Sequence, residues 1–340
     1  MESIRLALAG DVMLGRLTDH ALRQRGLNYP WGNVLPRLKA ADLTVVNLEC
    51  VVSRSGRPWS RWSKTFHFRA APHAIHALRL AGIDAVTLAN NHVLDYEEPA
   101  LLEMLTSLSR ADIAFAGAGR NLEEARRPAF LEARGLRLAI VAFTDNEPGW
   151  AATATSPGTN WLEVSLGEES LAIVRQSIAA ARQGGADAVL VSNHWGPNMV
   201  ERPSALFRQF AHAVIDAGAD IYFGHSSHLF QGVELYRGRP IIYDAGDFVD
   251  DYAVDPELRN DRGLLFELSL GRHGVRRIGL SPTIIDDCQV NLAEGEERQA
   301  IARRIAALSM EFGTVVQSAG DRWWIDCEAS QPQAAVTATS

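Results

Sequence analysis

The sequence predicts an α/β fold, because short apolar runs alternate with amphipathic stretches of helical periodicity over much of its length. The chain has 340 residues, enough to bury a sizeable core, and 47% of them are apolar, as in ordinary globular proteins. No internal repeat and no linker divides it. We therefore expect one domain over residues 1–327, followed over residues 328–340 by a disordered tail of small and polar residues.

Six runs rich in Val, Ile, Leu and Ala are typical of buried strands in a parallel sheet. They cover residues 5–9, 43–46, 85–88, 138–143, 188–191 and 221–223. Amphipathic helices are predicted between them at 73–81, 99–109 and 203–217, the last beginning at Pro203 because proline is favoured in the first helical turn. Gly82 and Gly218 follow the first and last of these helices, where glycine commonly ends a helix.

From residue 232 onward the pattern changes to shorter strands, predicted at 233–236, 240–243, 264–270 and 275–281. The sequence Arg237-Gly238-Arg239 between the first two indicates a hairpin turn. A final helix is predicted over 295–312. The regular alternation of strand and helix thus ends near residue 232.

Polar side chains follow four of the predicted strands, at the point where each strand ends. The segments are Gly10-Asp11, Asn90-Asn91-His92 with Asp95, Asn193-His194-Trp195-Gly196, and Gly224-His225-Ser226-Ser227-His228. A polar cluster at the end of a buried strand destabilises the fold unless it coordinates an ion, hydrogen-bonds or reacts. Four such ends in one chain predict a single site gathered from across a sheet, and a metal centre is the first hypothesis.

The segment from Asn90 to Asp95 contains residues suited to acid–base chemistry. His92 and Asp95 are three residues apart, so on a helical turn they share a face. A carboxylate bound to one imidazole nitrogen fixes the tautomer and raises the basicity of the other nitrogen. The alternative is a helix cap, because asparagine commonly satisfies free N–H groups at a strand-to-helix turn.

Three histidines and two acidic residues complete the candidate site. A single histidine beside a strand is usually an ordinary core or surface residue, but His194, His225 and His228 all stand at strand ends. Glu49 follows another strand. Asp247 belongs to the acidic run 244–251; such runs are usually solvated faces, but this one follows a strand, so Asp247 is expected to turn inward.

Composition and motifs exclude several function classes. The net charge of −8 argues against a nucleic-acid or anionic-membrane surface, and no apolar run is long enough to span a bilayer. The N-terminal apolar run is too short for a signal peptide and the three cysteines have no spaced pattern, so we expect a cytoplasmic protein. The chain has no Gly-x-Ser-x-Gly elbow, no Walker-type phosphate loop and no Gly-x-Gly-x-x-Gly fingerprint.

Five segments carry a resemblance to a known family. They are Gly10-Asp11-Val12-Met13-Leu14-Gly15-Arg16, Asn47-Leu48-Glu49, Leu88-Ala89-Asn90-Asn91-His92, His194-Trp195-Gly196, and Gly224-His225 leading through His228 to Glu234. From about residue 4 to residue 283 the chain resembles the CapA, or poly-γ-glutamate capsule synthesis, family of the calcineurin-like metallophosphoesterase superfamily. The resemblance implies a four-layer α/β/β/α sandwich with the metal at the carboxyl ends of the strands.

Four positions depart from that pattern. Met13 stands where a metal-binding histidine is usual, and Asn47-Leu48-Glu49 stands where a bridging aspartate is usual. Ser226-Ser227 interrupts the fourth motif, and Asp247 stands where the family often has asparagine. These departures argue against a complete two-metal centre and add acid–base groups to the site.

A site with fewer metal ligands and more His/Asp pairs favours proton transfer, and it resembles the branch of this family that epimerises the C-terminal Trp of lasso-peptide precursors. That resemblance implies a ribosomal precursor peptide as partner and one divalent ion, with Ca²⁺ favoured and Mn²⁺, Mg²⁺ or Zn²⁺ as alternatives. The expected metal ligands are Asp11, Glu49, Asn91, His194, His225 and His228. The expected catalytic pairs are His92 with Asp95, and His194 or His228 with Asp11 or Asp247. Trp195, Ser226 and His67 are expected to contact the substrate.

Two alternatives stay open. The first is a CapA-type metal-dependent hydrolase of a phosphoester or an amide, which two metals about 3.5–4 Å apart would favour. The second is a non-catalytic protein that binds an acidic polymer and uses the metal for its structure.

Overall fold

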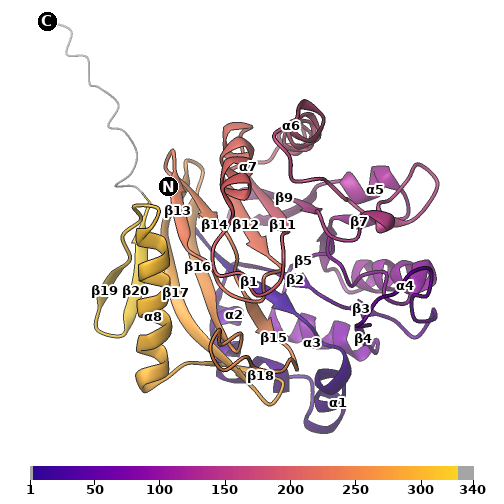
Figure 1. Cartoon of the computed structure of the whole chain (residues 1–340), viewed down its shortest axis with the longest axis horizontal. Coiled ribbons are helices and arrows are strands. Elements are labelled where there is room, and N and C mark those ends of the chain that lie inside the picture. The colour runs from indigo at the N-terminus through magenta and orange to yellow at the C-terminus, as the bar shows by residue number, and fades with distance from the viewer. Residues whose placement is uncertain (1–2, 328–340) are drawn as a thin grey trace, which may run out of the picture.

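Two β-sheets pack face to face and carry helices on both outer faces, which gives four layers in the order α/β/β/α (Figure 1). The computed structural model describes residues 3–327. Helices α6 (Glu168–Gln183) and α7 (Ala205–Asp216) lie at the top of Figure 1, and α1 (Arg16–Arg25) and α3 (His73–Ala81) lie at the bottom. The predicted α/β class and layer order are confirmed, whereas the tail predicted over 328–340 lies outside the described residues.

Within residues 3–327 the first sheet has ten strands. Its order is β19-β20-β17-β16-β1-β2-β5-β6, with β15 paired to β1 and β18 paired to β17. The bounds are β1 Ile4–Val12, β2 Leu43–Leu48, β5 Ala85–Thr87, β6 Ala114–Ala116, β15 Asp247–Val249, β16 Arg262–Gly271, β17 Gly274–Asp286, β18 Gln289–Leu292, β19 Gln317–Ala319 and β20 Arg322–Asp326. Strands β1, β2, β5 and β6 run parallel, and β16 and β17 continue the sheet in antiparallel pairing.

The second sheet has six strands in the order β13-β14-β12-β11-β9-β8. The bounds are β8 Ala129–Ala133, β9 Leu136–Thr144, β11 Ala188–His194, β12 Ile221–His225, β13 Val233–Tyr236 and β14 Arg239–Ile242. Strands β9, β11, β12 and β14 run parallel. Two small sheets pair β3 (Val51–Val52) with β4 (Arg69–Ala70), and β7 (Ala118–Gly119) with β10 (Gly158–Thr159).

Each space between layers holds its own apolar cluster. Leu8 of β1, Phe223 of β12 and Phe266 of β16 are fully buried between the two sheets. Trp31 lies in the cluster under the helices of the first sheet, and Tyr222 lies in the cluster under α6 and α7. Because a strand between two layers is buried on both faces, its sequence is continuously apolar, which explains the six runs seen in the sequence.

The remaining helices are α2 Leu35–Ala40, α4 Glu97–Arg110, α5 Leu122–Arg126 and α8 Gly295–Met310, with short 3-10 turns at Tyr29–Val34 and Pro148–Trp150. The helix predicted at 73–81 has those bounds and ends at Gly82, whose φ is 78°. The helix predicted from Pro203 begins instead at Ala205, because the Ser204 side chain accepts the Phe207 N–H at 3.2 Å and caps it. None of the described helices is long and apolar enough to cross a membrane.

Two glycines let backbones approach closely at the carboxyl ends of the central strands. A Cβ on Gly10 of β1 would lie 1.8 Å from the Gly246 carbonyl oxygen, and a Cβ on Gly224 of β12 would lie 2.0 Å from that of Tyr243. Only glycine fits at either position. These contacts hold the segment that leads into β15 against the ends of β1 and β12.

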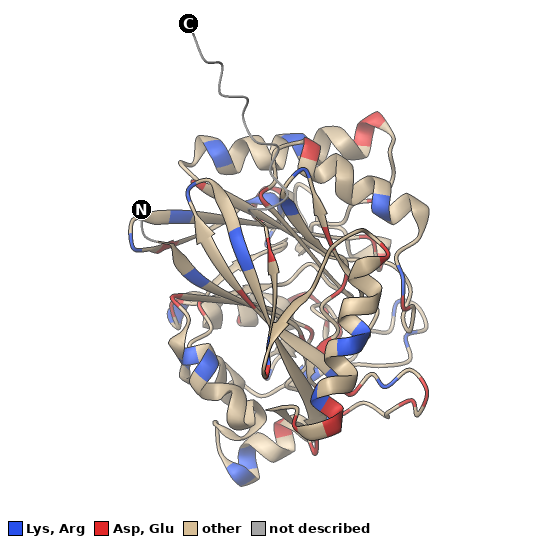
Figure 2. Ribbon diagram, turned by 90° about the vertical axis from the view of Figure 1, so that its left-hand side faces the viewer, with Lys and Arg blue, Asp and Glu red and all other residues tan. Residues whose placement is uncertain are grey.

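Figure 2 shows Lys and Arg positions interspersed with Asp and Glu positions along the helices and strands of the side that faces the viewer. All three cysteines, Cys50, Cys288 and Cys327, are buried and form no disulfide.

Candidate metal centre

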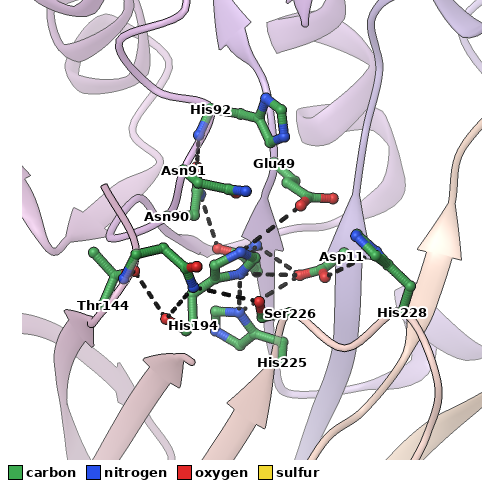
Figure 3. Close-up of polar contacts among 12 residues, drawn as sticks. Asp11, Glu49, Asn90, Asn91, His92, Thr144, His194, His225, Ser226 and His228 are labelled. Atoms are coloured by element: carbon green, nitrogen blue, oxygen red, sulfur yellow. Dashed lines mark hydrogen bonds and ion pairs between the residues drawn. The ribbon is translucent and has the colours of Figure 1, made fainter. Parts of the chain in front are cut away.

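The ends of strands from both sheets meet at one edge of the sandwich (Figure 3). Strand pairing places Asp11 of β1 opposite Asn47 of β2 and opposite Asp247 of β15. In the second sheet, His194 of β11 lies opposite His225 of β12. Polar residues from segments far apart in the chain therefore converge, as their positions at strand ends predict.

The first group, here called the histidine set, consists of Asp11, His194 and His225. All three are buried, and their ligand atoms lie within 4.8 Å of one another. Asp11 Oδ1 is 3.5 Å from His225 Nδ1 and 3.8 Å from His194 Nδ1, and the two Nδ1 atoms are 2.9 Å apart. Asn47 Nδ2 donates to Asp11 Oδ1 at 2.7 Å, and Ser192 Oγ lies 2.7 Å from His225 Nε2. These two contacts hold the carboxylate and the ring in place.

Both imidazoles of the histidine set are neutral at pH 7. Burial lowers the pKa of His225 to about 3, and burial together with the neighbouring His225 lowers the pKa of His194 well below its ordinary value. His194 Nε2 is buried and has no hydrogen-bond partner among residues 3–327, and it lies 3.8 Å from Glu49 Oε1. Neutral imidazole is the form that ligates metal ions, so this set is ready to bind one.

The second group, here called the carboxylate set, consists of Asp11, Glu49, His228 and Asp247, whose ligand atoms also lie within 4.8 Å of one another. His228 Nδ1 is 2.8 Å from Asp247 Oδ1 and 3.9 Å from Asp11 Oδ2. Tyr252 Oη donates to Glu49 Oε2 at 3.0 Å. Asp11 therefore belongs to both sets, with Oδ1 nearer the histidines and Oδ2 nearer His228.

Three buried carboxyl groups crowd this second set. Burial, followed by the charge of Asp247, raises the pKa of Asp11 well above its ordinary value. Burial and the charge of Asp11 raise the pKa of Glu49, and burial and the charge of Asp250 raise the pKa of Asp247. Asp11 Oδ2, Glu49 Oε1 and Asp247 Oδ2 are buried with no hydrogen-bond partner in the described chain.

These unpaired oxygens fit a divalent ion. A buried carboxylate without a partner is strongly unfavourable, and a cation bound among the three oxygens would compensate all of them. Carboxylate oxygens suit Ca²⁺, Mg²⁺ and Mn²⁺, whereas the imidazoles of His194 and His225 suit Mn²⁺ and Zn²⁺. The donor set is thus that of a metal centre and leaves the identity of the ion open.

His92 and Asp95 form the predicted pair, on the turn after β5. His92 Nδ1 lies 2.6 Å from Asp95 Oδ2, which also accepts the Phe68 N–H at 2.6 Å. The Phe68 ring stacks on the imidazole of His92 with 3.9 Å between centroids. Lys64 Nζ is 3.5 Å from Asp95 Oδ1 and donates to the Asn91 carbonyl at 2.8 Å. The imidazole is therefore held by a carboxylate and a ring, with Nε2 left to exchange a proton.

His92 and His228 have opposite protonation tendencies. Burial and the charge of Lys64 lower the pKa of His92 well below its ordinary value, and burial raises the pKa of Asp95 to about 7 against the effect of Lys64. Burial alone would lower the pKa of His228, but Glu49 and Asp11 outweigh it and raise that pKa. In Figure 3 the Glu49 carboxylate lies between the two imidazoles. Environments that drive two pKa values apart are how sites assign a base and an acid.

The two asparagines after β5 have different contacts. Asn90 Nδ2 donates to Asn47 Oδ1 at 3.0 Å and to the Leu48 carbonyl at 2.9 Å, and Asn90 Oδ1 accepts the His92 N–H at 3.0 Å. The capping role considered as an alternative thus belongs to Asn90. Asn91 Oδ1 is buried without a partner among the described residues, and its assignment as a metal ligand stays a prediction.

The three predicted substrate contacts lie in different surroundings. Trp195 is in the outer core, where its indole N–H donates to the Tyr243 carbonyl at 3.0 Å and its ring packs 4.7 Å from that of Phe207. Ser226 is buried next to His225, and His67 Nε2 donates to the Trp59 carbonyl at 3.1 Å. Trp195 thus packs between the second sheet and α7, and the substrate roles of all three stay predictions.

Sequence reasoning did not assign roles to Asn47, Lys64 and Tyr252, which all contact the site. Asn47 stands at a strand end and was visible as a departure from the family pattern. Lys64 and Tyr252 lie outside the helices and strands, and only the folded chain brings them to Asp95 and Glu49. No local pattern distinguishes them in the sequence.

The family model for the bacterial capsule synthesis protein PGA_cap matches residues 5–252 of this chain. The chain belongs to this family. All residues of both ligand sets fall within the matched region, so the candidate metal centre lies within the PGA_cap match. Strands β16 to β20 and helix α8 follow that region.

Relatives of this PGA_cap chain have names from polymer synthesis. The capsule biosynthesis protein CapA of Bacillus anthracis is 29% identical over 87% of this chain and 69% of its own length. A probable polyglutamine synthesis accessory protein of Mycobacterium tuberculosis is 34% identical over 73% of this chain and 75% of its own length. The PGA biosynthesis protein CapA of Bacillus subtilis is 28% identical over 83% of this chain and 71% of its own length.

Similar solved structures are distant. A Thermus thermophilus sulfate thiohydrolase, SoxB, covers 88% of this chain and 47% of its own, with 13% identity and a TM-score of 0.42. The match to TT1561 of Thermus thermophilus covers 78% of this chain and 94% of TT1561, with 12% identity and a TM-score of 0.40. Neither likeness carries an argument about function.

Proposed function

We propose that this PGA_cap protein is a metal-dependent hydrolase of the CapA type, which cleaves an amide bond in a peptide-like polymer. The observation that carries the proposal is the position of Asp11, whose two oxygens face two different ligand sets. A carboxylate shared between two cations is typical of two-metal hydrolases. The names of the relatives, which refer to capsule and polyglutamine synthesis, support a polymer as substrate.

The departures that argue against two metals in the sequence have counterparts in the structure. Asn47 does not offer a bridging carboxylate; instead its amide donates to Asp11 Oδ1. Met13 is buried, and its sulfur accepts the Gly15 N–H at 3.1 Å. Glu49 and Asp247 supply carboxylates to the set that contains His228. The proposal is therefore that these two acids replace the missing ligands.

In this reaction the protein's own groups move protons. Bound divalent ions would supply Lewis-acid stabilisation of the negative charge that develops on the carbonyl oxygen. His92 is the proposed general base: its Nε2 takes a proton from the attacking water, because Asp95 holds its Nδ1–H, and then gives that proton to the amide nitrogen as the C–N bond breaks. Phe68 stacks on His92 and Lys64 lies 3.5 Å from Asp95 Oδ1, so both are positioning residues that act through His92 and Asp95.

The test of the proposal is a count of metal ions combined with a product analysis. Metal-free protein is reconstituted with Mn²⁺, the bound metal is measured by mass spectrometry, and acidic peptides and a phosphoester are offered as substrates. We expect two ions per chain and EDTA-sensitive cleavage of an amide. One ion per chain, or cleavage of only the phosphoester, would contradict the proposal.

A second candidate function, epimerisation of a peptide Cα, is favoured by one observation. There are two His–carboxylate pairs, His92–Asp95 at 2.6 Å and His228–Asp247 at 2.8 Å, and in Figure 3 the two imidazoles lie on either side of Glu49. A base on one face of a Cα and an acid on the other are what inversion requires. In this candidate Asp11, His194 and His225 would hold a single ion, and His228 would exchange a proton instead of binding metal.

The same reaction run in D₂O separates the two candidates. Hydrolysis yields two shorter fragments, whereas epimerisation leaves the peptide intact and introduces one non-exchangeable deuteron at the inverted Cα. Deuterium uptake without cleavage would favour the epimerase over the hydrolase. If metal-bound protein forms neither product, the non-catalytic polymer-binding role is the one that remains.

A further inference from the structure

A basic cavity of about 650 Å³ lies next to the metal centre, on the side of His92. Its volume is that of a site for a small ligand or for one or two residues of a chain. It is lined by Arg16, Asp19, Arg23, Ser53, Arg54, His67, Arg69, Ala70, Ala71, His73 and Tyr96. We call it the arginine cavity, because four arginines face one carboxylate in its lining.

The arginine cavity shares a wall with the catalytic candidates. The guanidinium of Arg16 lies 5.1 Å from the centre of the Phe68 ring, and that ring stacks on His92. Phe68 also donates its N–H to Asp95, and the next residue, Arg69, begins β4 and lines the cavity. One aromatic ring therefore separates Arg16, which lines the cavity, from the proposed general base.

Two of the four arginines have their charge compensated. Arg16 pairs with Asp251 at 2.6 Å, and Arg23 pairs with Asp19. Asp19 also accepts the Ala71 N–H at 2.9 Å and lies 3.3 Å from His73 Nε2. The single carboxylate in the lining is therefore already neutralised by its own neighbours.

The guanidinium groups of Arg54 and Arg69 have no carboxylate partner within the described part of the chain. Glu103, the acid that contacts Arg54, accepts its backbone N–H together with the hydroxyl of Ser53. Arg69 is held with its guanidinium 4.0 Å from the centre of the Tyr96 ring. Two uncompensated positive charges in one cavity of a chain with a net charge of −8 indicate an anionic ligand.

We propose that the arginine cavity binds a carboxylate side chain of the substrate through Arg54 and Arg69, one or more residues away from the bond that reacts at the metal centre. This assignment rests on the proposed function for its substrate class, an acidic peptide-like chain. Guanidinium groups bind carboxylates in a bidentate, planar geometry, which gives orientation as well as affinity. The cavity would thus hold an acidic chain in a fixed register relative to His92.

The test measures binding without turnover. Metal-free protein in EDTA is titrated with a fluorescein-labelled hexaglutamate peptide and with the matched hexaglutamine peptide, and anisotropy is recorded. We compare the wild type with Arg54→Gln, Arg69→Gln and the double variant. Arg110→Gln, at the exposed C-terminal end of α4, is the matched control, and thermal melting checks that each variant folds.

We expect the double variant to bind hexaglutamate about tenfold more weakly or worse, and Arg110→Gln to stay within about twofold of the wild type. Equal affinity of the double variant and the wild type, or equal binding of hexaglutamine, would overturn the assignment. Inorganic phosphate is titrated separately, and binding of phosphate without binding of hexaglutamate would overturn it as well.

The outcome is independent of the proposed reaction. Charge-dependent binding that the arginine variants abolish, in a protein that cleaves nothing, would leave the arginine cavity assigned and remove the hydrolase. Cleavage of an acidic peptide that is unaffected by Arg54→Gln/Arg69→Gln would do the reverse.

Discussion

The histidine set and the carboxylate set share Asp11, but the first surrounds it with neutral imidazoles and the second with further carboxyl groups. In the histidine set two neutral imidazoles face one another across 2.9 Å, and burial accounts for their low pKa values. In the carboxylate set Glu49 and Asp247 join Asp11, and the pKa of His228 is raised. The first set contains one acid, Asp11, that must lose its proton to bind a cation, whereas the second contains three acids with raised pKa values.

This difference indicates a hierarchy between the two sets. The histidine set should fill first, and filling of the carboxylate set should depend more strongly on pH, because the pKa values of Glu49 and Asp247 are raised by burial. Protons compete with metal for these acids, so occupancy of the carboxylate set should rise with pH. Substitutions in each set and beside it test this hierarchy.

Replacement of Asp11 by asparagine should abolish both sets. The neutral amide removes the shared charge, and we expect metal binding to be lost and turnover to fall by more than about 1,000-fold, as loss of several kcal/mol of Lewis-acid stabilisation implies. Metal content and rate are measured on the same preparation. Asp42→Asn, in a surface ion pair with Arg134, is the control. An Asp11→Asn protein that keeps its metal would refute the shared-ligand arrangement.

Replacement of His92 by alanine should leave both sets filled and slow the reaction. A positioned general base contributes about 10²–10⁴-fold, and we expect a loss in that range with unchanged metal content. Asp95→Asn should act in the same direction, since Asp95 holds the His92 tautomer. Rates equal to wild type in both variants would remove the acid–base assignment.

Single changes in each set should separate them. His225→Ala removes a ligand from the histidine set only, and Glu49→Gln removes one from the carboxylate set only. We expect each variant to hold one ion where the wild type holds two, and only Glu49→Gln to lose the pH dependence of metal uptake. Metal titration at several pH values measures both. Identical behaviour of the two variants would show that the sets form one indivisible site.

Replacement of Lys64 by methionine should have the smallest effect, a shift of the pH profile. Lys64 lies 3.5 Å from Asp95 Oδ1 and lowers the pKa of His92, so its removal raises the pKa of the base. Activity that needs neutral His92 is present above that pKa and lost as pH falls through it. The acid limb of kcat/KM should therefore move to higher pH, with little change at the plateau. An unmoved limb would show that Lys64 acts only on the structure of its loop.

The strand ends were predictable from the sequence, and the contacts between them were only partly so. Continuous apolar runs mark strands buried on both faces, and the residue after such a run must lie at the sheet edge, which located Asp11, His194 and His225. The partner of His228 was left open between two aspartates, because strand order and register are long-range properties. The structure gives Asp247, brought beside Asp11 by the pairing of β1 with β15.

The arginine cavity had no sequence signal. Arg16, Arg54 and Arg69 lie in three separate segments, and single arginines are common on any surface. Lys64 likewise belongs to the long connection between β3 and β4, and the course of this connection places it near Asp95. Such paths depend on tertiary packing, so periodicity and local motifs do not determine them.

Whether Asp11 is shared between two ions is tested most directly by anomalous diffraction from crystals grown with Mn²⁺. We predict two peaks, each within about 2.0–2.6 Å of a different oxygen of the Asp11 carboxylate, one among the histidines and one among the acids. A single peak in the histidine set would turn the assignment to the epimerase. Absence of any peak at Asp11 would contradict the metal centre itself.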